Sequence, residues 1–134
     1  MILLAMTLFQ LNLDPLLDSI AAVESTSGKR SANVYQISDS YLRDVNRIVG
    51  FERYKYFPGF NTYDKFARSK SRDMMFVYWA FYGDKYQAAT GNAPTLEVLA
   101  RIHNGGPTGY KKSSTERYWR RVKKQLALRG IEVE

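Results

Sequence analysis

Apolar positions recur along most of the chain with the three-to-four-residue period of amphipathic helices. In the first such stretch, Leu16, Leu17, Ile20 and Val23 share one face. Each stretch is followed by a glycine, a Ser/Gly-rich segment or an Asn-Gly-Gly-Pro segment, all of which commonly end helices. With their capping residues, the predicted helices cover about residues 14–24, 38–50, 69–82, 95–103 and 113–130.

Two details complete the predicted fold. The Val34-Tyr35-Gln36-Ile37 stretch is rich in β-prone residues and predicts a small β element near residues 33–37. Ser113 and Glu116 have capping-box spacing, so the last helix is expected to open there. The fold class predicted from this pattern is mainly α, a compact helical domain with one small β element.

Length and composition limit the possible chemistry. The 134 residues fit one domain, expected over residues 10–130, with apolar residues 1–9 packed on it. That segment is too short to span a bilayer and lacks a basic start, so no membrane insertion is expected and a degenerate signal peptide is the alternative. The absence of cysteine and the single histidine, His103, exclude disulfides, a thiol nucleophile and a multi-histidine metal site. Nothing suggests a metal or organic cofactor.

The net charge of +7 is concentrated near the C-terminus. Residues 111–129 contain eight bases and one acid, whereas residues 1–28 contain three acids and no base. A basic segment of this kind suits a polyanion such as nucleic acid, an anionic membrane surface or a bacterial cell wall, and it equally suits a solvated helix face.

Aromatic residues gather between positions 51 and 66, which hold seven of the nineteen in the chain. Aromatic side chains more often bury area than bind ligands, so most are expected in the core, with Tyr54 and Tyr56 as the more exposed pair. Trp119 and Val122 are also expected in the core.

Glu24 is the first candidate for catalysis. It follows the apolar face of the first predicted helix and precedes a Ser/Gly loop. A carboxyl among apolar neighbours has a raised pKa, because burial disfavours its charged form, and a proton retained near neutral pH is what a general acid needs. On this helix alone, a surface glutamate at a helix end is the competing interpretation.

Further motifs follow Glu24 in a specific order. The Glu24-Ser25 pair ends the first helix, Tyr35-Gln36-Ile37 follows, and Ala-Arg-Ile-His-Asn-Gly-Gly-Pro-Thr-Gly spans residues 100–109. This set resembles the lysozyme superfamily, in particular the invertebrate-type (destabilase-like) lysozymes and their bacterial and phage relatives. The likeness extends with gaps from about residue 16 to 126. The chain resembles the lytic transglycosylases more distantly.

The resemblance implies an α+β lysozyme-like fold and a peptidoglycan glycosidase that cuts between N-acetylmuramic acid and N-acetylglucosamine. Glu24 matches the family's general acid, which protonates the departing glycosidic oxygen. The residues matched to substrate-binding positions in the cleft are Ser25, Tyr35, Gln36, His103, Asn104, Gly105 and Gly106. His103 is expected to contact substrate or support the loop.

The sequence departs from the family at the second carboxylate. Invertebrate-type lysozymes carry an aspartate between the glutamate and the Gln-Ile motif, but residues 25–35 contain no acid. Asp39 could serve only if the chain folds back. The alternatives are water held by a loop residue such as Ser31 or Asn33, a lytic transglycosylase mechanism with one carboxyl and a 1,6-anhydro product, or a weak or inactive wall-binding relative.

The expected partner is the glycan strand of peptidoglycan, with action at the bacterial cell wall or periplasm. A phage particle and release at lysis are the alternative settings. A basic nucleic-acid-binding module is a less favoured rival, because no helix-turn-helix, RNP or zinc motif is present. A structural phage domain without chemistry is a third hypothesis. A monomer is the default oligomeric state.

Overall fold

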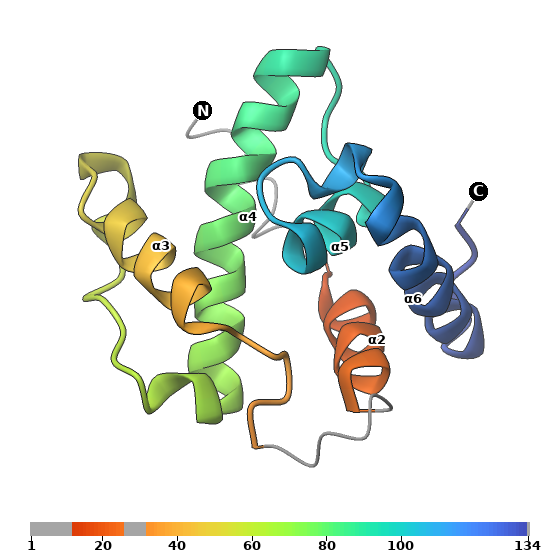
Figure 1. The fold of residues 1–134 in the computed structure, drawn as a ribbon, viewed down its shortest axis with the longest axis horizontal. Coiled ribbons are helices and arrows are strands. Elements are labelled where there is room, and N and C mark those ends of the chain that lie inside the picture. Colours follow the sequence, from red (N-terminus) through yellow and green to blue (C-terminus); the bar gives the residue numbers. More distant parts are fainter. Residues whose placement is uncertain (1–11, 26–31, 134) are drawn as a thin grey trace.

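The computed structural model describes residues 12–25 and 32–133, so the N-terminal segment 1–9 and Ser31 lie outside the described residues. Within the described ranges the regular structure is helical (Figure 1). The α-helices are α2 (Asp14–Ser25), α3 (Asp39–Val49), α4 (Arg68–Thr90), α5 (Leu96–Gly105) and α6 (Glu116–Leu128). Short 3₁₀ turns are η1 (Glu52–Tyr54), η2 (Asp64–Phe66), η3 (Gly109–Lys111) and η4 (Ser113–Thr115).

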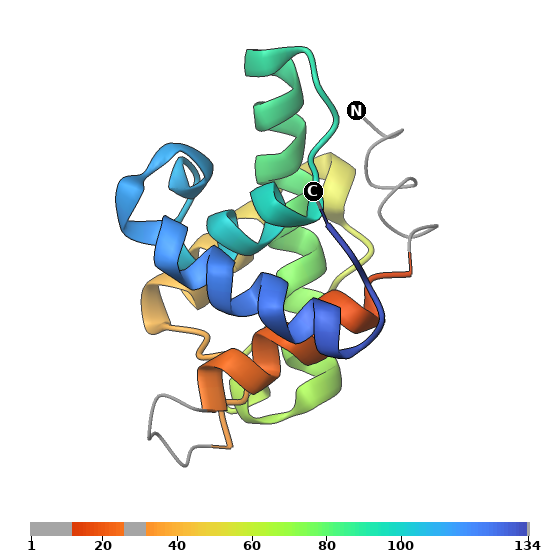
Figure 2. The same cartoon turned by 90° about the vertical axis from the view of Figure 1, so that its right-hand side faces the viewer.

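The longest helix, α4, runs through the middle of the molecule, with α3 packed on one side and α5 on the other (Figure 1). Helix α6 packs on α5 and also lies beside α2 (Figures 1 and 2). The centre of α4 is buried over consecutive positions, including Met74, Met75 and Trp79. The Trp79 indole nitrogen donates to the Leu99 carbonyl oxygen at 2.8 Å, which joins α4 to α5.

The mainly α fold class is confirmed, and the helices begin near the predicted positions. Ser38 caps α3 by accepting a hydrogen bond from the Tyr41 backbone N–H at 3.1 Å. The expected end of the third helix at Gly83 is wrong, because α4 continues to Thr90. Gly83 is a buried position within α4, and the left-handed residue that ends the helix is Gly91, with φ of 76°. None of the helices in the described part of the chain is both long and apolar enough to cross a bilayer.

The prediction of a small β element near residues 33–37 is also wrong, since this segment forms a turn and not a strand. The Gln36 backbone N–H donates to the Asn33 carbonyl oxygen at 3.1 Å. The Asn33 side chain also bonds both backbone groups of Ile37, at 2.8 and 2.9 Å. Asparagine therefore supplies locally the hydrogen bonds that a partner strand would provide, which is a known preference of this residue.

The capping box expected for the last helix is not formed. Ser113 belongs to η4, and α6 begins after Thr115, whose side chain makes no capping bond. The Thr115 hydroxyl instead donates to the Gly109 carbonyl oxygen at 2.6 Å and accepts from Arg101 Nε at 2.8 Å. These contacts fix the connection between α5 and α6.

Most aromatic side chains of residues 51–66 were expected in the core, but only one of the seven is fully buried. Phe60 is buried, and Tyr54 and Phe57 are half-buried. Four side chains are exposed: Phe51, Tyr56, Tyr63 and Phe66. The core positions expected for Trp119 and Val122 are confirmed.

Candidate active site

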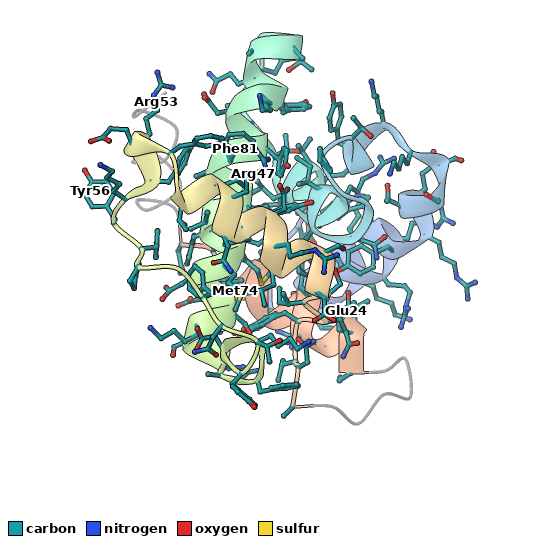
Figure 3. The ribbon with its side chains drawn as sticks, turned by 60° about the vertical axis from the view of Figure 1, so that its left-hand side comes forward. Glu24, Arg47, Arg53, Tyr56, Met74 and Phe81 are labelled. Carbon is teal, nitrogen blue, oxygen red and sulfur yellow. The ribbon has the colours of Figure 1, made fainter. Side chains whose placement is uncertain are left out.

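An open depression with a volume of about 540 Å³ lies where the end of α2 faces the start of α3. Glu24 is half-buried in its wall and is the penultimate residue of α2. Figure 3 shows Glu24 well away from Arg53 and Tyr56, which lie near the other end of α3. The depression is lined by Glu24, Asn33, Gln36, Ile37, Ser38, Asp39 and Lys65.

The turn at residues 33–36 presents Gln36 to this depression. Gln36 has a φ of 53°, which a non-glycine residue adopts only when its surroundings compensate the strain. Part of that compensation is a hydrogen bond from Gln36 Nε2 to the Asn33 carbonyl oxygen at 2.8 Å. The side-chain amide is thereby held in one orientation beside Glu24 and Asp39.

His103 holds the same turn from behind. Its Nε2 lies 2.9 Å from the Tyr35 carbonyl oxygen, and its Nδ1 lies 3.1 Å from the Tyr41 hydroxyl. The ring is buried, and burial lowers its pKa to about 4, against a smaller opposing effect of the bond to Tyr35. His103 therefore joins α5 to the turn and to α3 and does not reach the depression.

Asp39 is held by a lysine from a distant part of the chain. Lys65 Nζ lies 2.8 Å from Asp39 Oδ1, and the lysine side chain is only 16% exposed. This hydrogen bond and the charge of Lys65 lower the pKa of Asp39. The N-terminus of α3, where Asp39 is the first residue, also favours a negative charge. Asp39 is therefore ionised at neutral pH.

The helix that carries Glu24 acts on its carboxyl in the opposite sense to the helix that carries Asp39. It lies at the C-terminus of α2, where unpaired carbonyl groups disfavour a negative charge. The positive charge of Arg121 favours a negative charge at this helix end, since its Nη2 lies 3.4 Å from the neighbouring Val23 carbonyl oxygen. The Tyr118 hydroxyl is buried on the same side and has no partner of full hydrogen-bond geometry within the described ranges. Burial, then the charge and polar contact of Glu24, raise the pKa of Tyr118.

Four of the residues considered for the site are brought together, namely Glu24, Asn33, Gln36 and Asp39. Tyr35 is not, because its side chain is 0% exposed and its hydroxyl accepts from Arg72 Nε at 2.8 Å. Ser25 lines a neighbouring depression of about 460 Å³ and not the one that contains Glu24. The substrate contacts expected for Tyr35 and Ser25 stay predictions that these placements do not support.

The Asn104-Gly105-Gly106 segment lies at the end of α5 and does not line the depression. Gly105 serves close packing, since a Cβ there would overlap the Thr115 side chain, whereas Gly106 has a φ of 87°. A Cβ on Gly109 would likewise overlap the Arg101 carbonyl group. The Arg101 guanidinium bonds Glu97, Thr115 and the Lys112 carbonyl oxygen at 2.7–2.9 Å. The long motif at residues 100–109 thus shapes the α5–α6 connection, and its predicted substrate contacts remain predictions.

Sequence reasoning missed Lys65 and Ser38 as members of the site. Ser38 could have been found from the sequence, because it was predicted to cap α3 and the N-terminal end of α3 borders the depression. Lys65 could not have been found in this way, because its partner Asp39 is 26 residues away in the sequence. The described residues contain no cluster of three His, Asp or Glu side chains that could hold a metal ion.

The arrangement brings two carboxyl groups, of Glu24 and Asp39, and two amides, of Asn33 and Gln36, to a single open surface. Glycosidases use such a pair, with one carboxyl as proton donor and the other as nucleophile or base. The ionised Asp39 suits the second role, and Glu24 at the carbonyl end of its helix suits the first.

The sequence is similar to lysozymes from several invertebrates. It is 31% identical over 105 residues to a lysozyme from Meretrix lusoria, covering 78% of this chain and 75% of the relative. It is 32% identical over 104 residues to invertebrate-type lysozyme 6 from Caenorhabditis elegans, covering 72% and 67%. A match to lysozyme 1 from Crassostrea virginica is 50% identical over 44 residues and spans 33% of this chain but only 24% of that relative's length. No family model matches the chain.

Proposed function

Since the chain belongs to the invertebrate-type lysozyme family, we propose that it cleaves the β-1,4 bond between N-acetylmuramic acid and N-acetylglucosamine of peptidoglycan, with Glu24 as the general acid. Its place of action is then the bacterial cell wall. The observation that carries this proposal is the shared depression, in which Glu24, Gln36 and Asp39 face one open surface.

In this proposal Glu24 protonates the glycosidic oxygen as the bond to the muramic acid anomeric carbon breaks. The positive charge that develops on that sugar is stabilised by the ionised Asp39, which Lys65 keeps in place. Gln36 accepts or donates a hydrogen bond to an acetamido group, because its amide orientation is already fixed by Asn33.

Asp39 takes the place of the aspartate that the family carries before the Gln-Ile motif. The turn at residues 33–36 supports this assignment, because it reverses the chain and returns Asp39 to the depression that contains Glu24. If Asp39 acts as a nucleophile, the anomeric configuration is retained, and if it activates water, the configuration is inverted. Proton NMR of the first product sugar distinguishes the two.

A lytic transglycosylase is the second candidate function. The observation that favours it is the absence of any acid between Glu24 and Tyr35. In that mechanism the muramic 6-hydroxyl attacks the anomeric carbon, and Glu24 first donates and then accepts a proton. The product is an anhydro sugar, lighter than the hydrolysis product by one water, which mass spectrometry of the released fragments detects.

The test of the main proposal is the Glu24→Gln variant on purified peptidoglycan. Loss of the general acid is expected to lower kcat by at least about 100-fold. Glu116→Gln is the matched control, because Glu116 is an exposed glutamate at the start of α6 and does not line the depression. Wild-type rates in Glu24→Gln, measured by release of reducing ends, would refute the assignment.

A further inference from the structure

One face of α6 carries a continuous run of basic side chains. Successive residues of a helix are about 100° apart, so Arg117, Arg120, Arg121 and Lys124 fall within an arc of about 100°. We call these four residues the basic stripe. The opposite face of the helix is buried in the core through Tyr118, Trp119, Val122 and Leu126.

The basic stripe is exposed and largely uncompensated. All four side chains are exposed, and α6 contains a single acid, Glu116. In the described part of the chain no carboxylate lies within ion-pair distance of Arg117, Arg120 or Lys124, whereas other bases such as Arg72 and Arg101 are paired. The like charges of Arg117, Arg120 and Lys124 repel each other on one helix, so this part of the stripe costs stability unless an anion binds there.

The stripe begins beside the candidate site. Helix α6 packs along α2, so that Tyr118 lies beside Glu24 and Arg121 reaches the Val23 carbonyl oxygen at 3.4 Å. Arg121 therefore marks the edge of the stripe nearest Glu24. A polymer that passes Glu24 can reach Arg121 first and the other three bases next.

This inference rests on the proposed function. We propose that the basic stripe binds the carboxylates of the peptide stems carried by a peptidoglycan strand that is bound at Glu24. Each stem is joined by an amide bond to the lactyl carboxyl of N-acetylmuramic acid and ends in a free carboxylate. Because that amide bond removes the charge of the lactyl group, the sugars of a stem-bearing strand are neutral. The charge of the stripe is thus complementary to the part of the substrate that projects from the depression.

The consequence is a preference for stem-bearing over bare glycan. Exposed charge pairs are individually weak, so the preference arises from several pairs formed together and is reduced by salt. Among polyanions, the stem carboxylates are favoured over nucleic acid because they lie on the same polymer as the bond that Glu24 acts on.

The experiment uses the triple variant Arg117→Gln, Arg120→Gln, Lys124→Gln, in which Arg121 is retained for its contact with Val23. The control triple variant is Arg53→Gln, Lys55→Gln, Lys85→Gln, which removes the same charge from exposed positions far from Glu24, as Figure 3 shows for Arg53. The substrates are peptidoglycan strands with stems and the same strands after an amidase has removed the stems.

The stripe variant is expected to lose about tenfold in kcat/KM on stem-bearing strands at low salt and less than about twofold on stripped strands. The control variant is expected to change by less than about twofold on both. Equal losses on both substrates, no loss on either, or an equal loss in the control would overturn the inference.

A second arm is independent of catalysis. Each triple variant is combined with Glu24→Gln, and its binding to glycan strands with and without stems, both immobilised on beads, is measured. Weaker binding of the stripe variant to stem-bearing strands alone supports the inference, whether or not the wild type cleaves glycan. If the stripe variant instead loses binding to duplex DNA and keeps its preference for stem-bearing strands, the stripe is a nucleic-acid surface and the inference is wrong. If the wild type releases no fragments from either substrate, the proposed function fails separately.

Discussion

At the scale of single residues, His103 supports the candidate site although its side chain does not line the depression. A carbonyl oxygen can only accept a hydrogen bond, so the bond to Tyr35 places the proton on His103 Nε2. Nδ1 then accepts from the Tyr41 hydroxyl. Protonation would turn Nδ1 into a donor inside a buried space and would leave a buried charge.

The stability of the protein is therefore expected to fall in mild acid. The pKa of His103 is about 4 in the folded protein and about 6.5 in the unfolded chain, so between these pH values only the unfolded chain takes up a proton there. The contribution of His103 is complete above pH 6.5 and is lost as the pH falls to 4, up to about 3 kcal/mol. Urea unfolding at pH 7 and pH 4.5 measures most of this loss.

The His103→Gln variant is the reference for that measurement. Gln can still donate to the Tyr35 carbonyl oxygen but does not titrate, so the variant is expected to lose less stability between the two pH values than the wild type. Equal losses in both proteins would show that His103 does not control the acid sensitivity.

The residue scale also shows what the sequence can predict about the site. That Glu24 and Gln36 lie in one depression was predictable from the order of the motifs around them, whereas the apolar helix face alone left a surface glutamate as the competing interpretation. The ion pair of Asp39 with Lys65 was not predictable, because it depends on how residues 51–66 fold back onto the start of α3. Tyr35 was placed in the cleft by its motif, but its ring fills the core and only its neighbour faces the depression.

At the scale of elements, the connection between α5 and α6 depends on glycines that allow close approach. Gly109 is buried against the Arg101 carbonyl group, so any side chain there would displace one of the two segments. Gly91, which ends α4, has open space around it and needs glycine only for its φ of 76°.

The two glycines are therefore expected to respond differently to alanine. Gly91→Ala should cost about 1 kcal/mol, the usual cost of a left-handed conformation for a non-glycine residue. Gly109→Ala should cost about 3 kcal/mol or more, because the added Cβ would overlap backbone atoms of Arg101. Thermal unfolding of both variants measures the contrast, and similar costs would contradict the packing role of Gly109.

Helix positions could be predicted because their cause is local. Ser38 caps α3 and Thr95 caps α5 in agreement with the periodicity of the following residues. Two errors arose where tertiary contacts prevail over local signals, since Gly83 is buried within α4 and Thr115 is engaged by Arg101 instead of capping α6. The third error arose from a competing local interaction, because the Asn33 amide bonds Ile37 in place of a partner strand.

At the scale of the whole molecule, Arg72 joins the two sides of the candidate site. It lies on α4, and its guanidinium reaches Asp14 and Asp18 of α2 at 3.2 and 3.1 Å. Its Nε also donates to the buried hydroxyl of Tyr35 at 2.8 Å. The helix that carries Glu24 and the turn that carries Gln36 are thus fastened to one side chain.

Arg72→Met is expected to lower the free energy of unfolding by about 2 kcal/mol, mainly because the Tyr35 hydroxyl loses its buried partner. The two carboxylates are too exposed to add much. Lys70→Met is the control, because Lys70 is an exposed base on the same helix. Urea unfolding compares them, and an equal change in both variants would exclude the joining role.

The buried phenol of Tyr118 gives this protein an internal reporter. Because the ionised Glu24 raises the pKa of Tyr118, each change in the charge of Glu24 alters the electrostatic field at that ring. The ring resonances of Tyr118 in a proton NMR titration should then follow the protonation of Glu24 in the resting protein, without any sugar bound and without relying on rates.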